Sequence, residues 1–567
     1  MKTLSVVFLG ALCAVSLPLW AQTPPPAAPD AGSIMRTPET LRPPKAEPPP
    51  DLSLPEPEPT ALPEAAVPEE TLFIQSFRVE DVAPLTEAEV LAVLAPYAGR
   101  HLTMAQINEA AQAVTALYRA RGYMMASAFL PKQDARGGTL TLAVGLGRYG
   151  RVAVENRSLV RDAAVKGLFA PLQPGAVIER GGLERALLLT QALPGAKLPE
   201  VSLAAGAEPG TADVVVVVPP APRFSAFAVY DNQGSRYTGR HRLGLGAGVN
   251  SPLGLGDSLM LSGVFGRNGT SHMGSGRAAY SVPVGLSGGM LDVALDRTTY
   301  SLGDAYRDLD ATGQVDSVEL GGRYPVIRTQ EAGLALGVTV ASRRLRDEYE
   351  ALDYRIRKRA STATLKALAD RWGSVAGHTV HGALEAGLTL GRLRFDDAQH
   401  RADDRAGVKS GGDYSRLNLN GTLDVALVPG LSATVTLAVQ RALGRSLDSS
   451  ERLTISGSSG VKAYRESGTG DHGFIAGVEL RYRLPPVAGV NHAVGVFVDH
   501  AQARFVKPDY ALEDKLRLSD VGLGYYAARG PLFMKAQVAH KVGAEPDEVV
   551  MQRDGRTHFL FQLGATF

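Results

Sequence analysis

The sequence predicts two small α+β domains followed by a transmembrane antiparallel β-barrel of about 16 strands. The first observation is the alternation in the last residues, where the apolar positions are Phe559, Phe561, Leu563, Ala565 and Phe567. A strand of a soluble β-sandwich can alternate in this way, but so must a barrel strand that faces lipid on one side and a polar lumen on the other. The second is an amino-terminal export signal, and the third is that no later stretch of about 20 apolar residues could form a membrane helix.

The export signal is predicted over residues 1–21. Lys2 precedes an apolar run from Leu4 to Trp20, and Ala21 offers a small residue for cleavage. The only cysteine, Cys13, lies inside this run, so we expect no disulfide and no thiolate chemistry in the mature protein. Lipidation at Cys13 is disfavoured by Leu12 before it and by the apolar run that continues after it.

Residues 22–71 are rich in proline and acidic residues and are predicted to be an extended linker. Such a composition cannot build a hydrophobic core. A short helix around Ile34 to Leu41 is the alternative interpretation.

Helix and strand patterns alternate in two consecutive blocks, predicted as domains at residues 72–148 and 149–220. In the first block, Thr86 and Glu89 form a capping box for a short helix. A longer helix from Met104 to Arg119 follows and ends at Gly122, as a C-cap glycine should. The second block repeats the order strand, helix, helix, strand, strand.

The first block resembles the POTRA domain of two-partner secretion transporters, the TpsB family. The resemblance rests on Gly122 and Tyr123 after the helix, then Pro131 and Gln133, and the second block matches through Leu193-Pro194-Gly195. In this family, as in its relative BamA, periplasmic POTRA domains precede a carboxy-terminal barrel. The edge of such a sheet can accept an extended polypeptide by adding it as a further strand.

Residues 221–567 are predicted to form the outer-membrane β-barrel. From Phe224 to Phe567 there are 344 residues. Strands of about 10 residues with their turns and loops use about 20 residues each, which gives about 16 strands, an even number.

Two barrel segments resemble functional motifs of the same family. Asp231, Asn232 and Gly234 resemble the loop after the first barrel strand. The segment at Val461, Lys462, Ala463, Tyr464 and Arg465 resembles the loop that folds into the lumen. Its family tip reads Val-Arg-Gly-Tyr or Val-Arg-Gly-Phe, so Lys462 and Ala463 depart from the pattern.

The family's tip cation reaches an inward-facing aspartate on a neighbouring strand, and Phe497-Val498-Asp499 matches that position. A lysine has no planar fork, so we expect a single-pronged pair with Asp499. Ala463 also lacks the freedom of glycine at positive φ. Either Lys462 or Arg465 could supply the cation.

Enzymatic and metal motifs are weighed and set aside. Gly256-Asp257-Ser258-Leu259 spells an esterase motif but has no Asp-x-x-His pair near the carboxy-terminus, and it lies in a turn. Asp308, Asp310, Thr312 and Glu319 match part of a calcium loop, but their flanks have strand patterns. We expect no catalytic residue, metal or other cofactor. The net charge of +1 argues against a nucleic-acid partner.

The resemblance therefore implies a non-enzymatic transporter of the bacterial outer membrane with POTRA domains in the periplasm. Its partners would be one secreted exoprotein of the TpsA type, membrane lipid, and the barrel-assembly machinery during biogenesis. We expect a monomer. A BamA-like insertion factor and a passive porin are the alternatives. Whether the exoprotein is an adhesin, haemolysin, protease or toxin stays open.

Overall fold

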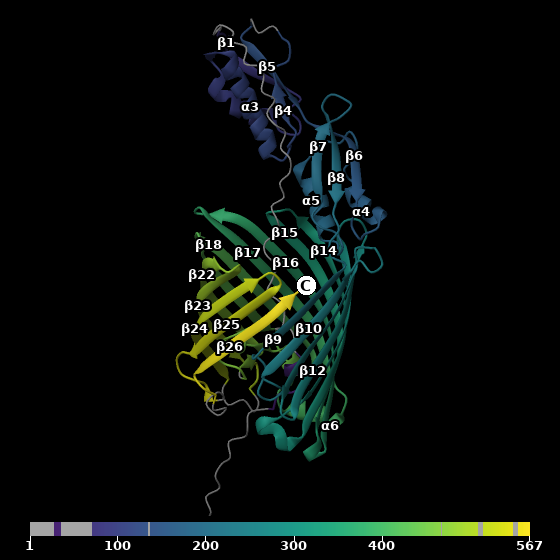
Figure 1. The fold of residues 1–567 in the computed structure, drawn as a ribbon, viewed down its shortest axis with the longest axis vertical. Coiled ribbons are helices and arrows are strands. Elements are labelled where there is room, and N and C mark those ends of the chain that lie inside the picture. Colours follow the sequence, from purple (N-terminus) through teal and green to yellow (C-terminus); the bar gives the residue numbers. More distant parts are fainter. Residues whose placement is uncertain (1–27, 36–70, 134–136, 467, 509–513, 548–553) are drawn as a thin grey trace, which may run out of the picture.

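The computed structural model describes residues 28–35, 71–133, 137–466, 468–508, 514–547 and 554–567. The predicted signal peptide and most of the predicted linker lie outside these residues. A barrel carries two α+β domains at one end (Figure 1). Among the described helices, none is long and apolar enough to cross a membrane.

The first α+β domain packs helices on a small sheet in which β5 lies between β2 and β4. The predicted capping box at Thr86 and Glu89 is present and begins α2. Helix α3 buries Ile107, Val114 and Tyr118 against the sheet. The elements are β1 (Leu72–Ile74), β2 (Ser76–Glu80), α2 (Glu87–Leu94), η2 (Ala95–Tyr97), β3 (Arg100–Leu102), α3 (Met104–Ala120), β4 (Ser127–Phe129) and β5 (Thr139–Gly145).

The second α+β domain repeats this plan, with β8 between its parallel neighbour β6 and its antiparallel neighbour β7. Alternate residues of β8, from Ala212 to Val218, are buried under the two helices because successive strand residues point to opposite faces. The elements are β6 (Arg148–Asn156), α4 (Asp162–Phe169), α5 (Arg180–Gln191), β7 (Glu200–Ala205) and β8 (Thr211–Val218).

Sixteen strands of the described residues close into an antiparallel barrel, as the sequence predicts. They are β9 (Phe224–Asp231), β10 (His241–Asn250), β11 (Ser258–Asn268), β12 (Ser271–Val284), β13 (Gly289–Ser301), β14 (Ala311–Arg328), β15 (Ala332–Tyr349), β16 (Tyr354–Val375), β17 (His378–Phe395), β18 (Gly412–Val428), β19 (Leu431–Ala442), β22 (His472–Val487), β23 (Val490–Arg504), β24 (Lys515–Arg529), β25 (Leu532–Lys541) and β26 (Thr557–Thr566).

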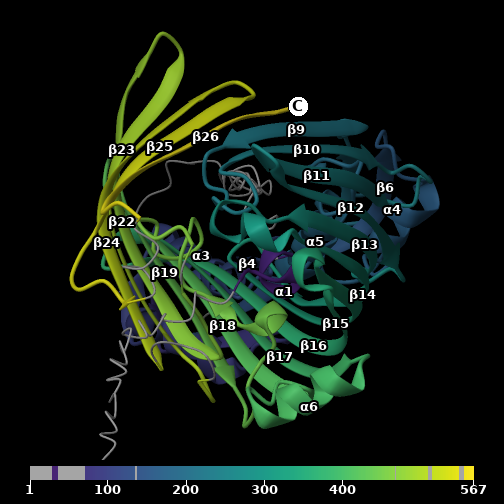
Figure 2. The same ribbon diagram turned by 90° about the horizontal axis from the view of Figure 1, so that it is seen from below.

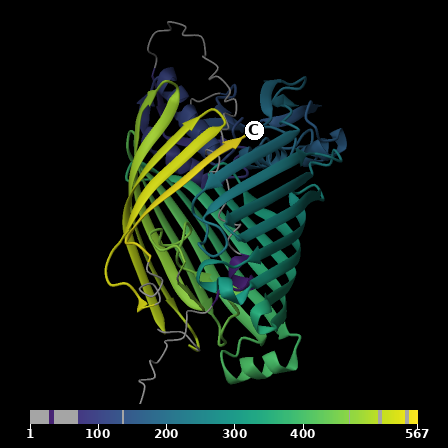
Figure 3. The same ribbon diagram turned by 60° about the horizontal axis from the view of Figure 1, so that its bottom comes forward.

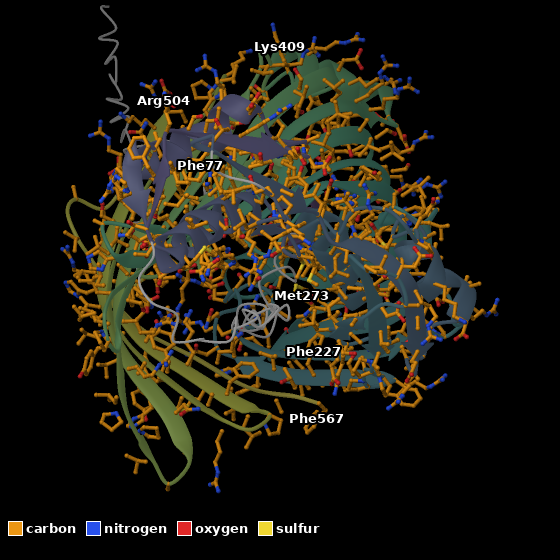
Figure 4. All side chains as sticks on the ribbon, turned by 90° about the horizontal axis from the view of Figure 1, so that it is seen from above. Phe77, Phe227, Met273, Lys409, Arg504 and Phe567 are labelled. Atoms are coloured by element: carbon orange, nitrogen blue, oxygen red, sulfur yellow. The ribbon has the colours of Figure 1, made fainter. Side chains whose placement is uncertain are left out.

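The alternation of the last strand places its aromatic side chains on the outer surface. Phe559 is 54% exposed, whereas its neighbour Leu560 is 3% exposed and faces inward. Phe567, labelled in Figure 4, follows β26 at the barrel wall and is 73% exposed. The apolar face is therefore the lipid-facing one, as predicted.

The barrel closes where β26 meets β9, over the short register from Gln562↔Asp231 to Thr566↔Phe227. The preceding pair, β25 and β26, has a longer register, from Leu532↔Ala565 to His540↔Thr557. Asn232 extends the closure beyond the ladder: its side chain donates to the Phe559 carbonyl at 3.0 Å and accepts from the Phe561 amide at 2.9 Å.

The second α+β domain contacts the rim at the end of the barrel that carries both α+β domains. The Arg161 amide donates to the Gly254 carbonyl at 2.8 Å, and the Arg185 guanidinium donates to the Pro325 carbonyl at 2.8 Å. Leu189 and Leu193 line an apolar cavity against the rim. This interface places the domain at the mouth of the lumen.

Two segments lie inside the ring of strands (Figures 2 and 3). One is the short helix α1 (Ala31–Ile34), from the region predicted as linker. The other runs from β19 to β22 and contains η5 (Ser449–Glu451), β20 (Leu453–Thr454) and β21 (Thr469–Gly470); we call it the lumen loop. The far end of the barrel carries η3 (Asp304–Leu309), η4 (Glu350–Leu352) and α6 (Ala398–Ala406).

Candidate functional site

The tip of the lumen loop is fixed to the barrel wall by an ion pair. Lys462 Nζ lies 2.5 Å from Asp499 Oδ2 on β23. The same ammonium lies over the ring of Phe497, 4.5 Å from its centroid. Asp499 and Phe497 are 5% and 2% exposed, so water screens the attraction between the two charges less than it does in a surface pair.

A second wall carboxylate holds the backbone of the tip. The Ala463 amide donates to Asp520 Oδ2 at 2.6 Å, and Asp520 lies directly opposite Asp499 in the β23·β24 register. Ala463 is fully buried and is not among the described non-glycine residues with positive φ. Alanine therefore fits here without the strain that its replacement of a family glycine suggests.

The remaining tip residues contact the last strands of the barrel. Tyr464 is 1% exposed, and Lys541 Nζ lies 5.0 Å from the centroid of its ring. Arg465 donates to the Phe559 carbonyl on β26 at 3.0 Å. The structure thus gives Lys462, and not Arg465, the contact with Asp499, and Arg465 links the loop to the closing strand.

The first-loop motif lies beside the lumen loop. Asp231 accepts two hydrogen bonds from Arg242, at 2.9 and 2.8 Å, in a buried bidentate pair. The Gly234 amide donates to the Arg240 carbonyl at 2.9 Å, and a Cβ at Gly234 would lie 2.0 Å from the Gly239 carbonyl oxygen. Only glycine fits this close approach.

Glu466 connects the two motifs. Its carboxylate accepts from Ser235 Oγ and from the Arg236 amide, each at 2.6 Å. Burial raises the pKa of Glu466 above its usual value, while these two hydrogen bonds act in the opposite direction. The turn after β9 and the lumen loop are therefore one connected unit.

The base of the lumen loop is attached to other strands of the barrel than its tip. Glu451 pairs with Arg343 on β15 at 2.8 Å and with Arg416 on β18 at 2.9 Å. Asp471 is fully buried and accepts from the Leu447 amide at 3.0 Å and the Val506 amide at 2.8 Å. The loop is thus attached to the barrel at its tip and at its base.

Helix α1 fills the space beside this base. Asp30 caps the helix through the Ser33 amide and also accepts from Ser449 Oγ at 2.6 Å and from Lys358 Nζ at 3.1 Å. Lys358 in turn lies 2.7 Å from Asp448 of the loop segment. Burial alone would raise the pKa of Asp30, but Lys358 and the hydrogen bonds outweigh it and lower the pKa to about 2.

The POTRA-motif residues have structural positions in the first domain. Gly122 has a φ of +96° after α3, and the Tyr123 ring lies edge-on to Tyr118 at 6.3 Å. The Gln133 side chain, two residues after Pro131, donates to the Thr141 carbonyl at 2.6 Å and accepts from the Thr141 amide at 2.8 Å. It thereby mimics a neighbouring strand of β5.

Several residues of the site were not among the predicted site residues: Asp30, Lys358, Glu451, Glu466 and Asp520. Asp520 carried a usable signal, because it interrupts an inward-facing series on β24 and pairs with Asp499 in an antiparallel register. The others come from segments far apart in the chain, and no local pattern brings them together.

Residues of the esterase-like and calcium-loop-like segments form structural contacts. Asp257 accepts from the Leu255 amide at 3.0 Å and from Tyr280 at 2.8 Å, so it holds a turn. Glu319 lies on β14 and pairs with Arg277 at 3.2 Å. Within the described residues, no group of three or more His, Cys, Asp or Glu side chains could hold a metal ion.

The sequence matches the models of two known protein families. Residues 210–516 match the haemolysin secretion/activation protein ShlB/FhaC/HecB, and residues 72–147 match the POTRA domain of ShlB type. The chain is 23% identical over 471 residues to the heme/hemopexin transporter protein HuxB of Haemophilus influenzae (strain 86-028NP), covering 80% of this chain and 82% of the relative. It is 24% identical over 439 residues to the outer membrane transporter CdiB of Dickeya dadantii (strain 3937), covering 75% and 76%.

Solved structures share the fold. CdiB from Escherichia coli superposes with a TM-score of 0.71 at 19% identity and covers 90% of this chain and 93% of that chain. CdiB from Acinetobacter baumannii gives a TM-score of 0.63 at 14% identity, with the same coverage.

Proposed function

Because the chain belongs to the haemolysin secretion/activation protein family ShlB/FhaC/HecB, we propose a division of labour for its role as an outer-membrane transporter of two-partner secretion. The two POTRA domains capture one unfolded secreted exoprotein in the periplasm. The barrel conducts that chain to the cell surface.

The observation that carries the proposal is the attachment of the lumen loop at Lys462 and Asp499. With α1 also in the lumen, the resting barrel is partly blocked. Both segments must move aside for a polypeptide to pass. The pair is single-pronged, so its separation breaks one contact and not a bidentate fork.

Capture uses the free edges of the small sheets. Within the described residues, β2 pairs with β5 alone and β7 pairs with β8 alone. Each therefore offers a row of backbone groups to an extended strand. Such pairing is largely independent of side chains, which suits an unfolded protein.

Release of the exoprotein at the cell surface makes transport directional. Folding of the exoprotein outside removes the extended chain from the exit side, so the equilibrium shifts outward without a nucleotide. We propose that the transporter is a monomer, is not an enzyme, and is inserted by the barrel-assembly machinery. A passive porin is disfavoured by a lumen that holds α1 and a loop attached at both ends.

The test is Asp499→Ala, measured as export in cells that express the transporter together with its exoprotein. We expect less secreted exoprotein at equal surface abundance of the barrel. The matched control is Asp424→Ala. Asp424 is a wall carboxylate on β18 that accepts a hydrogen bond from Thr434 on β19, away from the loop tip. Unchanged secretion in Asp499→Ala at equal abundance refutes the role of the pair.

A deletion of residues 72–220 separates the transporter from the porin. The transporter loses export of its partner, whereas a porin keeps its conductance role. Heat-modifiable migration of the barrel in gels checks that the shortened chain is inserted.

A further inference from the structure

A row of arginines crosses the outer surface of three neighbouring barrel strands. Arg344 of β15 lies directly opposite Arg359 of β16, which lies opposite Arg394 of β17. Arg346 and Arg357 form a second pair in the next outward row. All five are exposed.

The strand alternation shows that these side chains point away from the lumen. Arg343 contacts Glu451 of the lumen loop, Lys358 contacts Asp30 beside α1, and Leu393 is buried in the cluster around that helix. Successive residues of a strand point to opposite faces. Their sequence neighbours at positions 344, 357, 359 and 394 therefore face outward.

The arginine row is only partly neutralised. Arg359 pairs with Asp396 at 2.8 Å. Asp316 lies opposite Arg344 but binds Arg297 at 2.6 Å. In the described part of the chain, Arg344, Arg357 and Arg394 form no ion pair. Like charges placed directly opposite each other destabilise a sheet, so a bound anion would stabilise this row.

The row stands just above the apolar belt. Val340 and Leu390 are the outward residues four positions along β15 and β17, and they are 44% and 53% exposed. Four strand residues span about 13 Å. The row is at the end of the barrel that carries α6, opposite the POTRA domains, and so faces the outer leaflet (Figure 1).

We propose that this row binds the headgroup phosphates of an outer-leaflet lipid, namely a glycolipid with phosphate groups on its sugar. Adjacent guanidinium groups can bind phosphate oxygens through paired hydrogen bonds. The apolar belt below accepts the acyl chains of the same molecule. Two cross-strand rows of arginine offer sites for more than one phosphate.

The test measures lipid binding to the full-length transporter in detergent. The probes are diphosphoryl lipid A, its dephosphorylated counterpart and inorganic phosphate. The triple variant Arg344→Gln, Arg359→Gln and Arg394→Gln removes the row. The control is Arg307→Gln, Arg405→Gln and Arg504→Gln, which removes three exposed arginines from separate extracellular segments.

We expect the wild type to bind diphosphoryl lipid A at least tenfold more tightly than the dephosphorylated lipid. The row variant should lose that preference and the control variant should keep it. Equal binding of the two lipids by the wild type overturns the proposal, as does a control that loses as much as the row variant. Inorganic phosphate binding as tightly as lipid A identifies a free-anion site and also overturns it. If the row variant does not fold, the comparison of the three probes on the wild type decides alone.

Discussion

Replacing Asp30 with alanine should release α1 from the lumen. The change removes the N-cap of the helix, a contribution of about 1 kcal/mol. It also removes charge-assisted hydrogen bonds to Lys358 and Ser449, for about 2 kcal/mol net. Lys358 keeps Asp448, so no buried charge is left alone. The sum of about 3 kcal/mol corresponds to an increase of about 100-fold in the undocked to docked ratio.

Planar-bilayer recordings of the purified transporter measure this release as a rise in the open fraction of the pore. A cysteine placed at Ile34, which is 5% exposed, reports it independently through faster labelling by a soluble thiol reagent. Asp353→Ala, in the turn after η4, is the matched control. Unaltered conductance and labelling in a folded Asp30→Ala barrel refute the assignment of Asp30 as the residue that holds α1.

Three further outcomes are expected. Acidification should also undock α1. The pKa of Asp30 is lowered from 3.8 to about 2 in the docked state, so docking is stable above pH 3.8 and is lost as the pH falls toward 2. Conductance measured as a function of pH should show this loss in the wild type but not in Asp30→Ala. Lys462→Ala combined with Asp499→Ala should reduce secretion no more than either change alone, whereas additive losses would show that the pair does not act as a unit. Gln133→Ala should destabilise the first POTRA domain by about 1–3 kcal/mol, because it removes two hydrogen bonds with Thr141. Its melting temperature should be lower than that of the control variant Lys132→Ala, and equal melting temperatures of the two variants would contradict the prediction.

The fold was largely predictable because its signals are local. The capping box at Thr86 and the glycine after α3 mark helix ends in short stretches of sequence. The alternation in β26 fixes which face meets lipid, since one residue of register would move every aromatic side chain into the lumen. Chain length then gives the strand number.

The site was predictable only in part. The tip residues and Asp499 followed from a family pattern, but the choice between Lys462 and Arg465 depended on where the loop enters the barrel. The strain expected at Ala463 is absent because the loop path does not require positive φ there. The proline-rich composition around Asp30 predicted an extended linker. The alternative, a helix around Ile34 to Leu41, overlaps α1 only at Ile34, and its residues from 36 onward lie outside the described part of the chain.

The sequence by itself determined the class of molecule: two small α+β domains followed by a barrel whose strands alternate between lipid and lumen. Only the tertiary structure decided how the lumen is blocked. Glu451, Glu466 and Asp30 each bind a partner that lies more than 100 residues away in the chain. The alternation of apolar and polar residues depends only on neighbouring positions of one strand, so the sequence shows it directly. An ion pair inside the lumen depends on closure of the whole barrel.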